Sequence, residues 1–214
     1  MTSPIFLNVA QVVTNLTPGV LGAPVAHRIA VWVAGCSLGR LGTCAGCMST
    51  DWHAEGAGQP IPVAALVQLA DTRQQCGGLV VSGGEPTDQL VGILALLNGY
   101  KAIYPHAPVL LYSGRGEAWL RRHAEGLFSL TDAVVAGPYL QHRRSTSMAG
   151  SDNQRVLINT ALGAQVFGNW SEFLPRLQLL PAPGGHARLI GIPDHAARQR
   201  LQAAGLWPEI TLTE

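Results

Sequence analysis

The sequence contains little charge and almost no lysine. Asp, Glu, Lys and Arg make up 13% of its 214 residues, and Lys101 is the single lysine. The 14 basic residues nearly balance the 13 acidic ones, which gives a formal net charge of +1. A chain without a basic excess has no electrostatic reason to bind nucleic acid or an acidic membrane surface. Its 47% of apolar residues is instead typical of an ordered protein with a buried sheet.

The sequence also lacks the patterns of exported and membrane-embedded chains. Its start, MTSPIFLNVAQVV, has no basic segment followed by a long apolar core. No uncharged apolar run reaches the roughly 18 residues of a membrane-spanning helix. We therefore expect a cytoplasmic protein with no membrane partner. Because thiols stay reduced in that compartment, clustered cysteines indicate metal binding or catalysis before disulfides.

Short β-rich segments alternate with amphipathic segments along the chain. The predicted strands are 28–33, 79–82, 108–113, 132–137, 156–160 and 187–192, and the predicted helices are 61–76, 87–100, 116–126 and 194–205. This alternation predicts a mostly parallel sheet of about five or six strands, too few for a closed eight-stranded barrel. The expected fold class is therefore α/β, a partial (incomplete) β/α barrel. We expect residues 1–160 to form its core and residues 161–214 a strand–helix extension of the same domain.

Three of the four cysteines stand in one loop directly after the first predicted strand. Cys36, Cys44 and Cys47 have the spacing C-x7-C-x2-C, with glycines between them. Three thiolates can bind three irons of a [4Fe–4S] cluster and leave the fourth iron open, which a catalytic centre needs. With His53 the same cysteines would instead form a Cys3His zinc site. The spacing alone does not decide between the two. Trp52 and His53 follow the loop and are candidates to cover it.

A second motif, SGGEP, follows the next predicted strand and contains Gly83, Gly84, Glu85 and Pro86. A three-cysteine loop after one strand and a Gly-Gly-Glu-Pro turn after the next resemble the radical S-adenosylmethionine (radical SAM) superfamily. The segments VLLYSG, DAVVAGPYL and GSDNQR extend this resemblance to the small 4Fe–4S single cluster domain proteins related to anaerobic ribonucleotide reductase activating enzymes. The resemblance covers roughly residues 5–160, and RLIGIP near the end also fits these relatives.

The resemblance implies a cofactor pair and a set of binding residues. The three cysteines would bind the [4Fe–4S] cluster, whose free iron would chelate S-adenosylmethionine, and the Gly-Gly-Glu-Pro turn would lie beside the methionine amino group. Ser113 stands where a third-strand residue approaches the S-adenosylmethionine, and Asn153, Gln154 and Arg155 stand near the cofactor rim. A flavodoxin or ferredoxin would supply an electron, S-adenosylmethionine would be cleaved to a 5′-deoxyadenosyl radical, and that radical would abstract hydrogen from a substrate.

The resemblance leaves the reaction subtype and the substrate open. The relatives usually have C-x3-C-x2-C, so the interval between Cys36 and Cys44 is four residues longer here. A small-molecule or peptide substrate, or a partner protein in the case of a glycyl-radical enzyme activase, is expected. A non-catalytic zinc or iron–sulfur module is the alternative from another class. The fourth cysteine, Cys76, precedes the second predicted strand, and we expect a buried structural thiol there.

Overall fold

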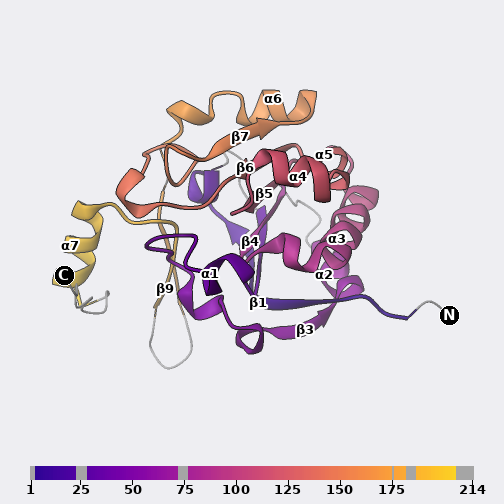
Figure 1. Ribbon diagram of the computed structural model, residues 1–214, viewed down its shortest axis with the longest axis horizontal. Coiled ribbons are helices and arrows are strands. Elements are labelled where there is room, and N and C mark those ends of the chain that lie inside the picture. Colours follow the sequence, from indigo (N-terminus) through magenta and orange to yellow (C-terminus); the bar gives the residue numbers. More distant parts are fainter. Residues whose placement is uncertain (1–2, 23–27, 72–76, 175, 182–186, 206–214) are drawn as a thin grey trace.

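The computed structural model describes residues 3–22, 28–71, 77–174, 176–181 and 187–205 (Figure 1). Its strands are β1 (Phe6–Leu16), β2 (Arg28–Val33), β3 (Gln59–Pro62), β4 (Leu79–Gly83), β5 (Val109–Ser113), β6 (Ala133–Ala136), β7 (Arg155–Ile158), β8 (Gln178–Pro181) and β9 (Ala187–Ile190). Its α-helices are α1 (Ser37–Arg40), α2 (Val63–Asp71), α3 (Leu90–Ile103), α4 (Glu117–His123), α5 (Gly126–Leu130), α6 (Ala161–Phe167) and α7 (His195–Ala203). The protein is therefore a mixed α/β fold.

Seven strands form one sheet in the order β3-β1-β2-β4-β5-β6-β7. The central strands β2, β4, β5 and β6 are parallel, as the alternating pattern predicts. Strands β1, β3 and β7 pair antiparallel at the two sides. The sheet has an edge at β3 and another at β7, so the described strands form no closed barrel, and the partial barrel stays a prediction.

The predicted strand count is too low, because the sequence reading omitted β1, β3 and β8. Strand β3 contains Pro60 and Pro62, which cannot donate ladder hydrogen bonds, and it lies at an edge where that is tolerated. The predicted strand at 187–192 exists as β9, but it pairs with β8 in a separate two-stranded sheet. Helices α1 and α6, and all but the first residue of α5, also lie outside the predicted helices. The division into core and C-terminal extension stays a prediction.

Each face of the sheet has its own apolar core. Helices α2, α3, α4 and α5 cover one face (Figure 1), where Val31, Val81 and Leu111 pack against Leu97 of α3. The opposite face is covered by the segment around Met148, by α6 and by Ile190 of β9. Strands buried on both faces need continuous apolar sequence, which is why AVVA in β6 is easily recognised as a strand. No described helix has the length and apolar composition to cross a membrane.

Candidate functional site

The carboxyl ends of the parallel strands meet at one edge of the sheet, where the cysteine loop follows β2 and the Gly-Gly-Glu-Pro turn follows β4. The two segments are joined by backbone hydrogen bonds: Gly84 N donates to Val33 O at 2.7 Å, and Glu85 N donates to Gly35 O at 3.0 Å. A Cβ on Gly84 would stand 2.1 Å from Gly35 O, so only glycine allows this approach. Gly83 has φ +110°, in a region that favours glycine. The adjacency that the sequence predicts is therefore present.

The three cysteines lie in the loop that follows β2. Cys36 is 7% exposed and caps α1, with its Sγ accepting a hydrogen bond from Gly39 N at 3.1 Å. Cys44 and Cys47 are partly exposed, and Cys47 Sγ accepts from Ser49 N at 3.4 Å. Burial raises the pKa of all three thiols, against the lowering effect of their backbone hydrogen bonds. Because a metal ligand must be a thiolate, binding of iron here would displace protons.

The long interval between Cys36 and Cys44 folds as an extra helical turn. Ser37–Arg40 form α1, and Gly42, with φ +68°, ends the turn. Asp88 of the next loop fixes its start, because its carboxylate accepts from Ser37 N at 2.6 Å and from Ser37 Oγ at 2.8 Å. The additional residues therefore form a short element attached to the Gly-Gly-Glu-Pro loop.

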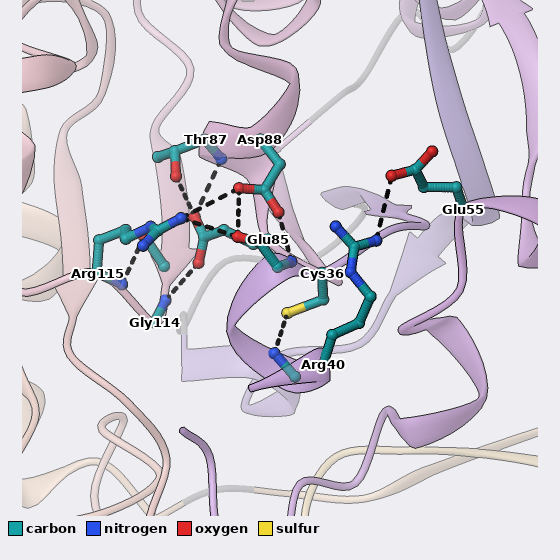
Figure 2. Close-up of polar contacts among 11 residues, drawn as sticks. Cys36, Arg40, Glu55, Glu85, Thr87, Asp88, Gly114 and Arg115 are labelled. Carbon is teal, nitrogen blue, oxygen red and sulfur yellow. Dashed lines mark hydrogen bonds and ion pairs between the residues drawn. The ribbon is translucent and has the colours of Figure 1, made fainter. Parts of the chain in front are cut away.

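Arg115, which follows β5, joins the same network. Its Nη2 donates to Ser37 Oγ at 2.8 Å and lies 3.3 Å from Asp88 Oδ1 (Figure 2). The guanidinium also lies over the ring of Trp119, 4.6 Å from its centroid. One cation thus links the loops after β2, β4 and β5. Sequence analysis missed this network, because Asp88 and Arg115 belong to no recognised motif.

Glu85 is the most buried polar residue of the site, with 1% of its surface exposed. Its Oε1 accepts from Thr87 N, Thr87 Oγ1 and Ser113 Oγ at 3.0, 2.7 and 2.8 Å, and its Oε2 accepts from Gly114 N at 2.8 Å (Figure 2). Burial raises the pKa of Glu85, and these hydrogen bonds act in the opposite direction. The Glu85 carboxylate therefore links the turn after β4 to the end of β5. All four of these hydrogen bonds are accepted from protein groups.

A cavity of about 380 Å³ opens beside these loops. Cys44, Cys47, Gly83, Gly84 and Ser113 line it, so the structure brings five of the predicted site residues to one space. The remaining three, Cys36, Glu85 and Pro86, are not among the described residues that line the cavity. They are buried behind it.

The polar stretch at 153–155 divides between the cavity and the surface. Asn153 and Gln154 donate to Pro138 O at 2.7 Å and to Gly137 O at 2.9 Å, and Gln154 also lines the cavity. Arg155 points outward and pairs with Glu117 at 2.6 Å. Of the three, Gln154 is therefore the residue that lines the cavity.

The zinc alternative depends on His53. Its ring lies over α1, since a Cβ on Gly39 would meet ring atoms at 2.5 Å, and its Nε2 is buried without a hydrogen-bond partner. Across the described residues, no group of three or more His, Cys, Asp and Glu side chains is arranged to hold a metal ion. Cys76 lies outside the described residues.

The residues fit an iron–sulfur cluster by the chemistry of their donors and by the space beside them. Three soft thiolate donors in one glycine-rich loop suit iron–sulfur clusters. The Gly114 backbone also comes close, since a Cβ there would stand 3.6 Å from Cys44 Sγ. Glycines thus surround the thiols on both sides and leave room for a bulky group.

A comparison with protein families agrees with this chemistry. The sequence matches the 4Fe–4S single cluster domain family over residues 22–157. The chain belongs to that family. The matched region contains all three cysteines, the Gly-Gly-Glu-Pro turn and Ser113, so the 4Fe–4S domain coincides with the site. A comparison with curated proteins found no match.

The cavity is also lined by Trp32 and Gln11, which the sequence analysis does not predict as site residues, and by Trp52, a candidate to cover the cysteine loop. The ring centroids of Trp32 and Trp52 lie 6.2 Å apart, and Gln11 belongs to β1. A usable signal was present for Gln11, because it is a polar residue among the alternately buried residues of β1, between Val9 and Val13. The face that it occupies follows only from the register shift with β2.

Proposed function

We propose that the protein is a radical SAM enzyme acting on a small-molecule or peptide substrate. One observation carries the proposal: the cysteine loop and the Gly-Gly-Glu-Pro turn are hydrogen-bonded to each other and border the same cavity. Two cofactor-binding motifs with this arrangement can hold a cluster and a second ligand side by side. Membership of the 4Fe–4S single cluster domain family supports the cluster half of the proposal.

The chain's own residues supply binding and position. Cys36, Cys44 and Cys47 would hold the cluster, and the backbone of Gly83 and Gly84 would let the methionine end of S-adenosylmethionine approach closely. Ser113 is 4% exposed and donates to Glu85, so it holds its part of the cavity wall in place. Glu85 and Pro86 would position this wall from behind. When bound and reduced by a flavodoxin or ferredoxin, the cluster supplies the electron that cleaves S-adenosylmethionine to methionine and a hydrogen-abstracting 5′-deoxyadenosyl radical.

The test is anaerobic reconstitution with iron and sulfide, followed by incubation with dithionite and S-adenosylmethionine. We expect an iron–sulfur absorption band, about four irons per chain as the cluster type requires, and formation of 5′-deoxyadenosine. Alanine substitution of Cys36, Cys44 or Cys47 should remove both signals. Cys76→Ala is the matched control and should retain both. Folded wild-type protein that binds one zinc per chain and forms no 5′-deoxyadenosine would exclude the proposal.

A further inference from the structure

The floor of the cavity is a row of side chains on the face of the sheet opposite α2, α3, α4 and α5. Gln11 of β1 pairs with Trp32 of β2, and Trp32 pairs with Ser82 of β4. Tyr112 of β5 stands one residue beyond the Val81–Leu111 pair, beside Ser82. Paired residues of neighbouring strands point to the same face, so an amide, an indole, a hydroxyl and a phenol lie side by side under the cavity.

Gln11 is the unusual member of this row. It is 8% exposed, and its Nε2 has no hydrogen-bond partner. A buried amide without a partner costs free energy, so a polar group that enters the cavity and accepts from this nitrogen would recover that cost. Tyr112, by contrast, already donates its hydroxyl hydrogen to Met148 O at 3.3 Å. Among the described residues of this row, Gln11 is the one with a buried side-chain nitrogen that lacks a hydrogen-bond partner.

An irregularity in β1 brings this amide to the cavity. The pairing of β1 with β2 shifts register between Val9 and Gln11. Val9 packs in the core under the helices, whereas Val13 packs in the core on the opposite face. A one-residue shift of register moves every following side chain to the opposite face of the sheet. Gln11 therefore points toward the cavity instead of the core under the helices.

The remaining lining combines aromatic and apolar residues with serines and Gln154, and the described part of it holds no acid. Trp52, Met148 and Ile190 form walls around the floor. None of the described lining residues is Asp or Glu, whereas Arg144 and Arg176 both reach the cavity. Arg144 is occupied, because it donates to Pro193 O and Ile192 O. Arg176 is exposed and has no carboxylate within ion-pair distance in the part of the chain described, so it is available to an anionic group.

We propose that Gln11 and its aromatic neighbours bind a nucleobase-type substrate, a flat heterocycle with adjacent hydrogen-bond donor and acceptor, and that Arg176 receives an anionic substituent such as a 5′-phosphate. Glutamine amides pair with base edges through two hydrogen bonds, and bases stack on aromatic side chains. Arginine is suited to phosphate. The absence of acids from the described lining disfavours a cationic substrate. The inference rests on the proposed function, since it assigns the substrate half of the same cavity.

The experiment measures binding by isothermal titration calorimetry under anaerobic conditions. The probes are adenosine, guanosine, uridine and cytidine, their 5′-monophosphates, and N-acetyltryptophanamide as an aromatic amide of another class. S-adenosylmethionine is titrated separately into every variant. The variants are Gln11→Leu, Arg176→Gln and Gln68→Leu, the last a matched change on the exposed side of α2. Gln11→Asn, which keeps an amide but shortens its reach, replaces Gln11→Leu if the latter does not fold.

We expect at least one nucleoside and its monophosphate to bind wild-type protein. Gln11→Leu should weaken both at least tenfold, because the loss of a paired base edge has that order of effect. Arg176→Gln should weaken the monophosphate to the affinity of the nucleoside. Gln68→Leu should match wild type, and affinity for S-adenosylmethionine should stay within twofold in all variants.

Three outcomes would overturn the inference. In the first, protein that binds S-adenosylmethionine binds no nucleoside or nucleotide. In the second, Gln11→Leu loses affinity for S-adenosylmethionine as much as for the nucleoside. In the third, N-acetyltryptophanamide binds more tightly than every nucleotide. A failure of the proposed function is distinguishable, because reconstituted wild-type protein would then form no 5′-deoxyadenosine. The nucleotide titrations can still be made on metal-free protein.

Discussion

Replacement of Gly84 by alanine tests the contact on which the site depends. The new Cβ would stand 2.1 Å from Gly35 O and 2.8 Å from Gly35 C, both backbone atoms that cannot rotate away. One of the two segments must therefore move by about 1 Å to restore a normal contact distance. Both hydrogen bonds between them, Gly84 N to Val33 O and Glu85 N to Gly35 O, lie within the displaced region.

The expected loss of stability follows from these contacts. Overpacking against rigid backbone costs about 1–3 kcal/mol. Weakening of the two hydrogen bonds adds about 1 kcal/mol. We expect a total of about 2–4 kcal/mol, which for a chain of this length lowers the melting temperature by about 5–15 °C. Anaerobic circular dichroism melts of the metal-free protein measure this directly, and iron per chain after reconstitution should fall because the loop that carries Cys36 is displaced.

The matched control is Gly56→Ala. Nothing lies within 4 Å of a Cβ at that position, and Gly56 is exposed. We expect its stability to stay within about 0.5 kcal/mol of wild type. If Gly84→Ala melts together with this control and binds a full complement of iron, the close approach of the two loops is not required, and the reasoning fails.

Three further predictions test buried contacts, one at the site and two elsewhere in the fold. Glu85→Gln puts an amide NH2 among four hydrogen-bond donors, so urea denaturation should show a free energy of unfolding lower by about 2–3 kcal/mol. An unchanged denaturation midpoint would show that the carboxylate does not hold the two loops together. Lys101→Met removes the ion-pair partner that lies 2.7 Å from Asp132, whose side chain is 3% exposed, and should lower the free energy of unfolding by about 3–5 kcal/mol. The control Arg121→Met breaks an exposed ion pair and should lower it by less than about 0.5 kcal/mol. Leu97→Ala, at 0% exposure, should cost about 2–5 kcal/mol in the same assay, and a smaller value would show that α3 can close the void.

The parallel centre of the sheet could be predicted because its signal is local. Strands β2, β4, β5 and β6 each contain a run of at least three apolar residues, as is typical of strands buried on both faces. The antiparallel strands could not be recognised in the same way. QPIP in β3 has two prolines and becomes a strand only because β1 offers it an edge.

The two cofactor motifs could also be recognised from local sequence. The cysteine spacing and the Gly-Gly-Glu-Pro turn are short-range patterns, and the family to which the chain belongs could be recognised from them. The resemblance assigned Glu85 to the cofactor, yet its acceptor positions meet donors of Thr87, Ser113 and Gly114, two of which lie on another strand or its loop. That partnership spans 28 residues or more of sequence, so no local pattern encodes it.

The sequence by itself therefore determined the central strand segments, their parallel arrangement, and the grouping of the cysteines and glycines in the loops that follow them, because each depends on residues adjacent in the chain. The tertiary structure alone decided which of these residues line a common cavity, how α1 accommodates the long cysteine interval, and that the register shift in β1 turns Gln11 toward the cavity beside Trp32. The physical reason is that burial and hydrogen-bond partners are supplied by distant segments, and these fix where a side chain points only after the sheet has formed.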